Sequence, residues 1–220
     1  MSDGIKFDLI IKNARVVRPN KTSVDLLDIG VKDGKIAALH PNLNAADAAK
    51  GVDAENKLAF TGVVDAHMHT GIYNPLDEDA LSESRAAAMG GVTSSLNYMR
   101  TGQYYLNKGG PYKDFFPEVL EVSDGNFYVD YGYHLAPMMK QHIEEIPDLV
   151  GEHGVTSFKI FMFYGSHGLH GRSTDQSDFL MTPPGEKYDY AHFEFVMRGI
   201  KKAMEKYPEK KDVISCSLHC

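Results

Sequence analysis

The chain of 220 residues has little cysteine, no excess of positive charge and no long apolar run. Its two cysteines, Cys216 and Cys220, share one short segment, which predicts reduced thiols in a cytoplasmic protein rather than a disulfide framework. The formal net charge of −7, without a dense cluster of Lys and Arg, argues against nucleic acid as a partner. No stretch approaches the roughly 20 apolar residues of a spanning helix, and no secretory signal is visible, so we expect no membrane association.

The rest of the composition is that of an ordinary globular protein. Of the residues, 43% are hydrophobic and 24% are charged, which is enough to bury a core without disulfides. Residues 1–60 predict a small β module, whose strongest signal is a tight hairpin around Asp33-Gly34. The strands expected in this module lie at 7–12, 15–17, 27–32 and 35–39, and a loop is expected at 44–51.

From residue 61 to residue 220 the pattern changes to alternating strands and helices. Expected strands lie near 63–69, 92–98, 127–135, 155–163 and 213–218, with helices at 79–89, 111–122, 139–153 and 190–206. Such alternation implies parallel strands joined by right-handed crossovers, hence an α/β fold. Five strands fit either an open doubly wound sheet or most of a (β/α)8 TIM-type barrel. No Gly-x-Gly-x-x-Gly follows the first strand, which argues against a nucleotide-binding version.

Two histidines stand at the end of the first of these strands. Side chains alternate along a strand, so His67 and His69 point to the same face and can hold one ion between them. Parallel α/β folds place their active sites at the C-terminal ends of strands, which is where this pair lies. The pattern therefore suggests a catalytic metal site, although His-x-His also occurs on solvated strand faces.

Lys159 is unusual because it lies inside an otherwise apolar strand. A buried, unpaired ammonium is costly, so this lysine needs a buried acid as partner or must lose its charge. Addition of CO2 would do the latter, because it converts the amine into a carbamate whose two oxygens can bridge two metals. His219, at the end of the fifth strand, is either a structural histidine or a third imidazole for a second metal.

Several segments together resemble the amidohydrolase superfamily, specifically its cyclic amidohydrolases: dihydropyrimidinase, hydantoinase and allantoinase. They follow one another in the order of the family: Phe60-Thr-Gly-Val-Val-Asp-Ala-His-Met-His69, Ala86-Ala-Ala-Met-Gly-Gly-Val-Thr-Ser94, Asp130-Tyr-Gly-Tyr-His-Leu135, Gly154-Val-Thr-Ser-Phe-Lys-Ile-Phe-Met-Phe-Tyr164 and Leu218-His219. The stretch from Ser157 to Tyr164 is similar to the dihydropyrimidinase and hydantoinase branch.

The resemblance implies a fold and a role for each candidate residue. Residues 1–60 would be the N-terminal part of a small β-sandwich domain, and residues 61–220 the first five β/α units of a TIM-type barrel. His67 and His69 would bind the more buried metal, carbamylated Lys159 would bridge both metals, and His219 would bind the second. Tyr164 would donate a hydrogen bond to the oxyanion. Asp65 would be either a structural carboxylate, which we favour, or a carboxylate that hydrogen-bonds to the metal ligands.

The activity implied is hydrolysis of a C–N bond in a small cyclic amide or imide, such as a hydantoin or dihydropyrimidine. Two divalent ions, most simply zinc, would lower the pKa of a bridging water to about 7, and the hydroxide would attack the ring carbonyl. The resemblance also implies a homo-oligomer, a tetramer. The alternatives are a non-catalytic scaffold similar to the collapsin-response proteins, or another branch such as dihydroorotase or allantoinase.

The sequence departs from the family in two places. The family needs a further histidine on a sixth strand and an aspartate on an eighth, and neither has a counterpart before Cys220. We therefore expect the N-terminal portion of a longer enzyme, or one piece of a split enzyme, that hydrolyses nothing by itself. The second departure is a long polar loop after the tyrosine, suited to a polar or anionic substrate group or to a surface insertion, and its candidates are His167, His170 and Arg172.

The other histidines and tyrosines carry weaker expectations. His134 is expected to be a hydrogen-bonded core residue, whereas the three helical histidines are expected to be exposed; these are His142, His153 and His192. A substrate contact and a loop or subunit interface explain three tyrosines equally well; these are Tyr104, Tyr105 and Tyr112.

Overall fold

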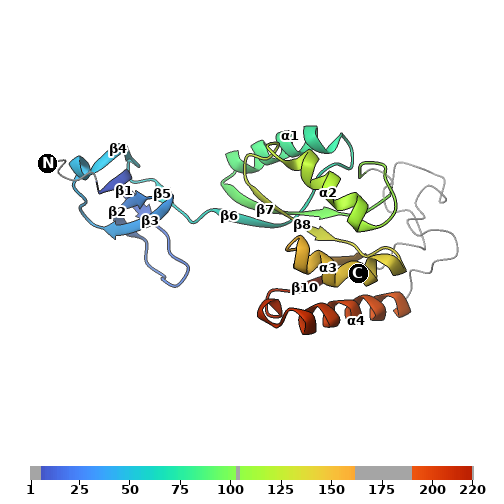
Figure 1. Ribbon diagram of the computed structural model, residues 1–220. Coiled ribbons are helices and arrows are strands. Elements are labelled where there is room, and N and C mark those ends of the chain that lie inside the picture. The colour runs from blue at the N-terminus through green and yellow to red at the C-terminus, as the bar shows by residue number, and fades with distance from the viewer. Residues whose placement is uncertain (1–5, 103–104, 162–189, 220) are drawn as a thin grey trace. The chain divides into compact units, whose positions relative to one another are not determined.

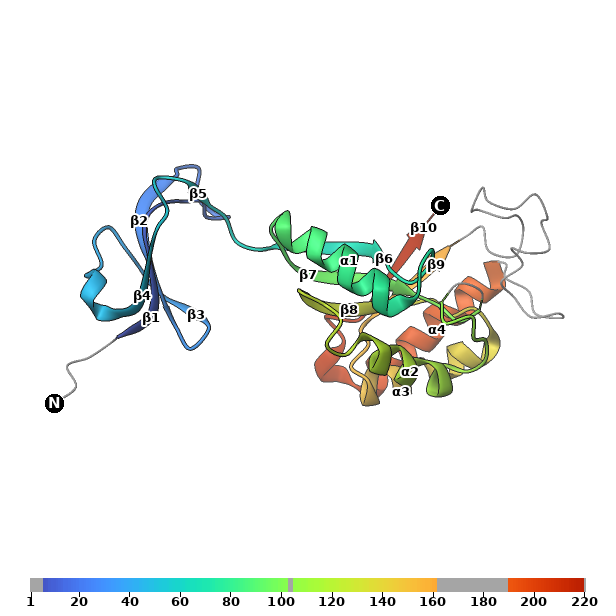
Figure 2. The same cartoon turned by 90° about the horizontal axis from the view of Figure 1, so that it is seen from above.

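The computed structural model describes residues 6–102, 105–161 and 190–219. The chain divides into two compact units, Met1–Gly62 and Val63–Cys220. Figure 1 and Figure 2 show the first as a small sheet and the second as a parallel sheet with helices. Among the described residues, no helix combines the length and the apolar character that crossing a bilayer requires.

The first unit is a mixed sheet with the order β3-β2-β1-β4, to which β5 adds beside β1. Its strands are β1 (Phe7–Val16), β2 (Asp25–Lys32), β3 (Lys35–His40), β4 (Ala48–Asp53) and β5 (Leu58–Ala59), and a short η1 (Ala45–Asp47) precedes β4. The β2–β3 hairpin confirms the predicted turn, since Asp33 and Gly34 both have positive φ, 50° and 71°.

Two local predictions in this unit were wrong. The two strands expected at 7–12 and 15–17 are one strand, β1, whose register shifts between Ile11 and Ala14. The loop expected from Asn44 to Gly51 contains η1 and most of β4, which pairs in parallel with β1. The backbone of this stretch finds its partners across the sheet, and small polar side chains carry no sign of such pairing.

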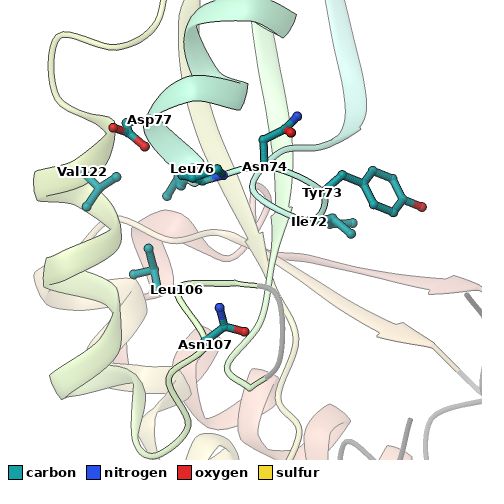
Figure 3. A pocket seen from close by; sticks show the side chains of 9 residues that line it. Ile72, Tyr73, Asn74, Leu76, Asp77, Leu106, Asn107 and Val122 are labelled. Atoms are coloured by element: carbon teal, nitrogen blue, oxygen red, sulfur yellow. The ribbon is translucent and has the colours of Figure 1, made fainter. Parts of the chain in front are cut away.

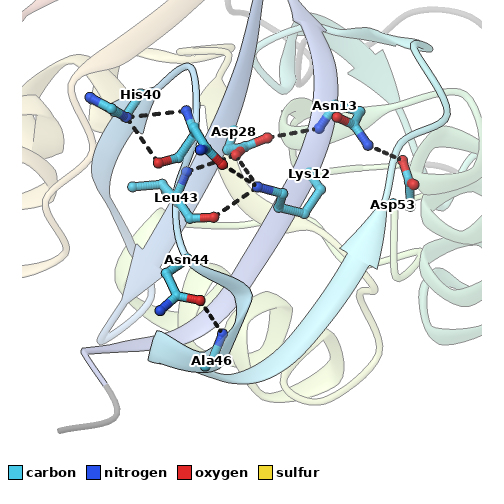
Figure 4. A network of polar contacts seen from close by, with 9 residues as sticks. Lys12, Asn13, Asp28, His40, Leu43, Asn44, Ala46 and Asp53 are labelled. Carbon is cyan, nitrogen blue, oxygen red and sulfur yellow. Dashed lines mark hydrogen bonds and ion pairs between the residues drawn. The ribbon is translucent and has the colours of Figure 1, made fainter.

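A buried carboxylate links the strands of the first unit to the segment after β3 (Figure 4). Asp28 is 2% exposed, and it accepts hydrogen bonds from Lys12 Nζ at 2.5 Å, the Asn13 amide at 2.9 Å and the Leu43 amide at 2.8 Å. These bonds satisfy a charge that burial alone would make costly.

The second unit has a five-stranded parallel sheet with the order β10-β9-β8-β7-β6. The strands are β6 (Val63–His69), β7 (Val92–Met99), β8 (Asp130–Leu135), β9 (Ser157–Phe161) and β10 (Ser215–His219). Each strand pairs with the next one along the chain, without the reversal of order that defines a doubly wound sheet. Of the two expected architectures, the curled half-barrel is therefore the one observed.

Helices lie along one side of this curled sheet (Figure 1 and Figure 2). They are α1 (Leu76–Met89), α2 (Tyr112–Ser123), α3 (Lys140–Glu152) and α4 (Tyr190–Lys206), with a short η3 (Pro208–Lys210) before β10. Strand residues such as Leu135, Phe158 and Ile160 form the core with helix residues such as Phe115 and Val196, all fully buried. Helix α4 occupies the range that its apolar periodicity predicts.

The prediction that the three helical histidines are exposed was wrong: His153 is half-buried against the ring of Phe116, and the other two are buried. His142 is fully buried and His192 is 5% exposed. The His142 ring accepts from the Met138 amide at 3.0 Å and donates to the Gly110 carbonyl at 2.8 Å, and His192 Nε2 lies 2.7 Å from the Pro137 carbonyl. Both imidazoles satisfy backbone groups of the loops next to the helices, which is why they are buried.

Candidate metal centre

The candidate site begins with the two imidazoles at the end of β6. As strand alternation predicts, both lie on one face: His67 Nε2 and His69 Nε2 are 3.1 Å apart, and the ring centroids are 4.9 Å apart. Both side chains are exposed in the part of the chain that the structure describes. Two ligand nitrogens of a tetrahedral zinc ion lie about 3.3 Å from each other, so the observed separation is close to the one needed.

The strand that carries these imidazoles is irregular, and a third histidine holds it. The β6–β7 register shifts between Asp65 and Met68. In this stretch the Ala66 carbonyl lies 2.7 Å from His134 Nε2, and the other nitrogen of His134 is 2.5 Å from Ser157 Oγ on β9. His134 is 5% exposed, which confirms the expectation of a hydrogen-bonded core residue. Its bonds tie the backbone beside His67 to two inner strands.

Lys159 approaches the same imidazoles from β9. Lys159 is 8% exposed, and its Nζ lies 3.3 Å from His67 Nε2 and 5.0 Å from the ring centroid of Phe161. Within the described ranges, no carboxylate forms an ion pair with Lys159, which disfavours the buried-acid alternative there. Burial lowers the pKa of Lys159, because the charged ammonium loses its hydration.

The electrostatics of the site favour neutral imidazoles. The pKa of His67 is lowered to about 4, first because nearby protein atoms partly desolvate the ring and then by the charges of Lys159, His134 and His219. His134 shifts in the same direction, again through burial first. At neutral pH these rings are uncharged, which is the form that binds metal.

His219 lies in the same neighbourhood at the end of β10. It pairs in parallel register with Phe161 of β9, and the two ring centroids are 4.4 Å apart. Phe161 in turn lies beneath Lys159 Nζ, and His219 contributes to the lowered pKa of His67. The structure therefore places the four sequence-predicted metal residues on one sheet, two on β6 and one each on the neighbouring strands β9 and β10.

Asp65 has a local role in this geometry. Its Oδ1 accepts a hydrogen bond from the His67 amide at 3.1 Å, which supports the turn of the backbone at the irregular stretch. The remaining predicted site residues lie outside the described residues; they are Tyr164, His167, His170 and Arg172.

A contact that sequence reasoning did not assign involves Tyr105. Its hydroxyl is 3.2 Å from His69 Nδ1, on the side of the ring away from His67. Tyr105 lies on the segment that follows β7, and no spacing pattern connects it to β6. Only the fold brings these two side chains together.

The segments next to His69 and Tyr105 also border a cavity of about 490 Å³ (Figure 3). Buried Asp79 of α1 holds the first of them, accepting from the Gly71 amide at 2.9 Å and from Asn74 Nδ2 at 2.8 Å. The lining residues labelled in Figure 3 are Ile72, Tyr73, Asn74, Leu76, Asp77, Leu106, Asn107 and Val122.

Comparisons with known proteins identify the relatives of this chain. It is 33% identical to a D-hydantoinase of Geobacillus stearothermophilus over 160 residues, which is 70% of this chain and 32% of that protein. It is also 33% identical to an allantoinase of Escherichia coli O1:K1 over 181 residues, 80% of this chain and 37% of that protein. This chain is a homologue of the cyclic amidohydrolases. The resemblance inferred from the motifs is thus confirmed, although no family model matches the chain.

Solved cyclic amidohydrolase structures share the fold. An L-hydantoinase (dihydropyrimidinase) from Arthrobacter aurescens superposes with a TM-score of 0.66 at 23% identity, over 90% of this chain and 39% of that one. A D-hydantoinase crystal structure gives 0.61 at 25% identity, over 91% and 43%. The chain spans about a third of the length of the curated cyclic amidohydrolases it matches.

Within the described ranges, no group of three or more His, Cys, Asp or Glu side chains is arranged to hold a metal. The imidazoles of His67 and His69 together with the amine of Lys159 are the convergent set in this homologue.

Proposed function

We propose that the complete protein hydrolyses a C–N bond of a cyclic amide or imide at a binuclear metal centre. In this proposal residues 61–220 supply the first five units of a (β/α)8 barrel, and residues 1–60 supply part of a β-sandwich domain. The observation that carries it is the convergence of His67 Nε2, His69 Nε2 and Lys159 Nζ, each within 3.3 Å of a neighbour, in a homologue of hydantoinases and allantoinases.

The residues fit a pair of divalent ions, for which zinc is our choice. His67 and His69 would hold one ion, His219 would serve the second, and Lys159 would bridge both as a carbamate. The fit rests on the imidazole separation of 3.1 Å and on the neutral state of His67. Divalent ions bound there would lower the pKa of coordinated water to about 7 and polarise a carbonyl.

The carbamate of Lys159 forms without any further reagent than CO2. The neutral amine attacks the carbon of CO2, an N–C bond forms, one C=O π bond becomes the carboxylate, and the nitrogen releases one proton. Burial favours the neutral amine that this reaction requires. The product carries a carboxylate, with two oxygens, on the Lys159 nitrogen.

The protein's own groups would handle the substrate around this centre. We assign Tyr164 as the hydrogen-bond donor to the oxyanion that develops at the ring carbonyl. His167, His170 and Arg172 are assigned to contacts with polar or anionic groups of the ring substituent. Asp65 holds the backbone amide of His67 and takes no part in proton transfer. The ring itself is a hydantoin, a dihydropyrimidine or a relative, as the names of the homologues support.

The proposal is tested by zinc binding to the chain in bicarbonate buffer. We expect bound zinc and the added mass of one CO2, and we expect His67→Ala/His69→Ala to lose the zinc and Lys159→Met to lose the CO2. His40→Ala is the matched control, because His40 is an exposed histidine of the other unit and its zinc titration should equal that of the parent.

Two results would contradict the proposal. The first is equal zinc affinity in the parent and in His67→Ala/His69→Ala. The second is ring opening of hydantoin or dihydrouracil by residues 1–220 alone, because the proposal places further ligands on later strands.

A further inference from the structure

Tyr105 is buried beside the candidate centre, where its ring contacts Tyr98 and Arg100. It is 2% exposed, and its ring centroid lies 5.8 Å from that of Tyr98 and 4.8 Å from the guanidinium carbon of Arg100. Tyr98 and Arg100 are themselves fully buried. Aromatic edge contacts and the cation over the ring fix the phenol in one orientation, with its hydroxyl toward β6.

The Tyr105 hydroxyl lies 3.2 Å from His69 Nδ1. A neutral imidazole has one N–H donor and one acceptor nitrogen, and the partner of one nitrogen decides the tautomer of the ring. His69 Nε2 faces His67 Nε2 and the centre, so Nδ1 is the nitrogen left for a hydrogen bond at the back of the ring.

We propose that Tyr105 is a positioning residue for His69: its phenol oxygen accepts the Nδ1–H and leaves Nε2 with its lone pair directed at the metal. This inference rests on the proposed metal centre and deepens it. Metal-binding histidines commonly donate their second ring N–H to a fixed acceptor, and loss of that acceptor typically costs about ten- to a hundredfold in metal affinity. In this chain the acceptor comes from a segment 36 residues away on the next β/α connection.

The test compares Tyr105→Phe with Tyr112→Phe. The first substitution removes the hydroxyl on His69 and keeps the ring in its contacts with Tyr98 and Arg100. The second removes an equally buried hydroxyl, 2.6 Å from the Ala136 carbonyl, that touches none of the candidate ligands. Both variants lose a buried hydrogen bond, so a general loss of stability affects both.

Two readouts separate a positioning role from a structural one. The first is the tautomer of His69 from its ring ¹⁵N shifts in the metal-free chain: we expect Nδ1–H in the parent and in Tyr112→Phe, and a rise of Nε2–H in Tyr105→Phe. The second is the zinc dissociation constant, which should increase about tenfold or more in Tyr105→Phe alone.

The outcomes also distinguish this inference from the proposed function. An Nε2–H tautomer of His69 in the parent, or an unchanged tautomer in Tyr105→Phe, overturns the role of Tyr105 whether or not zinc binds. Zinc affinity that is equal in parent and Tyr105→Phe overturns it as well and leaves the metal centre standing. If the parent shows the expected tautomers but binds no zinc, the proposed metal centre is wrong, and Tyr105 does not orient His69 for a metal.

Discussion

Asp28 is a residue whose ionisation contributes to the stability of the Met1–Gly62 unit. Burial alone would raise the pKa of Asp28, but the hydrogen bonds from Lys12, Asn13 and Leu43 outweigh burial and lower it. A carboxyl with a lowered folded-state pKa stabilises the protein fully above its unfolded pKa of about 4. That stability is lost as the pH falls through the folded-state value. We expect acid to destabilise this unit in that window, measured by thermal unfolding from the methyl signals of the buried Ile10 and Ile29.

Asp28→Asn is the control for this pH dependence. It keeps the shape and removes the titration, so the slope of stability against pH below about pH 4 should be shallower in the variant. At neutral pH the variant should be less stable by about 2 kcal/mol, because charge-assisted bonds become neutral and one amide donor faces another. Parallel slopes in parent and variant would show that other carboxylates govern the acid response.

At this scale the sequence predicts alternation and burial but not long-range partners. Strand alternation was enough to expect His67 and His69 on one face, and the apolar surroundings of Lys159 were enough to expect either a buried acid beside it or a neutral amine. The bond of His134 to Ala66 spans 68 positions, and that of Tyr105 to His69 spans 36, so no local pattern encodes either. The burial of His142 and His192 was missed because the carbonyls they satisfy belong to neighbouring loops.

Helices α3 and α4 approach each other closely at Gly199. A Cβ built at Gly199 would lie 2.9 Å from Ile146 Cδ1 and 3.0 Å from the carbonyl oxygen of Ile143. Alanine would favour the helix by about 1 kcal/mol in isolation, but the carbonyl belongs to the backbone of α3 and yields only if the helices separate. We expect Gly199→Ala to lower the free energy of unfolding by about 1–3 kcal/mol.

Tyrosine fluorescence in a denaturant titration measures this effect, because all 12 tyrosines lie beyond residue 62 and the chain has no tryptophan. Gly109→Ala is the control in the same unit, since Gly109 is exposed and its added Cβ would meet nothing within 4 Å. A Gly199→Ala protein as stable as Gly109→Ala would show that the two helices repack without cost.

At the scale of elements, amphipathic periodicity located the helices well. The small polar residues of 44–51, by contrast, led to a loop being predicted where most of β4 lies. Helix α4 begins and ends where its apolar face predicts, and α3 runs without interruption through Pro147. Strand β8 begins at Asp130, three residues later than expected, because the strand starts only where pairing with β7 begins at Ser94. Element ends depend on pairing partners, which sequence patterns do not contain.

The Val63–Cys220 unit has two open sheet edges in the part of the chain that the structure describes. Strand β6 pairs with β7 alone and β10 pairs with β9 alone. Apolar side chains on these edges are solvent-exposed, with Val63 at 51%, Val64 at 67% and Leu218 at 58%. Unpaired apolar strands associate with other strands unless charge or cover prevents it. We expect the isolated chain to self-associate with rising concentration, as followed by sedimentation velocity.

Val64→Lys tests this expectation, because a charge on the edge should shift the chain toward the monomer. Leu26→Lys places the same charge at a residue of similar exposure, 54%, in the other unit, and should leave association unchanged. A parent chain that stays monomeric at every concentration, or equal effects of the two variants, would refute the role of these edges.

The position of β6 at the edge of the described sheet has a consequence for the proposed metal centre. A strand held by one neighbour can fray on its own, at a lower free energy than global unfolding requires. Because His67 and His69 both lie on this strand, fraying of β6 would separate the proposed metal ligands. A bound ion would in turn stabilise β6 against fraying. Metal occupancy of the proposed site and the local order of residues 63–69 would then be thermodynamically linked. A higher ion concentration would raise the free energy needed to unfold β6 locally.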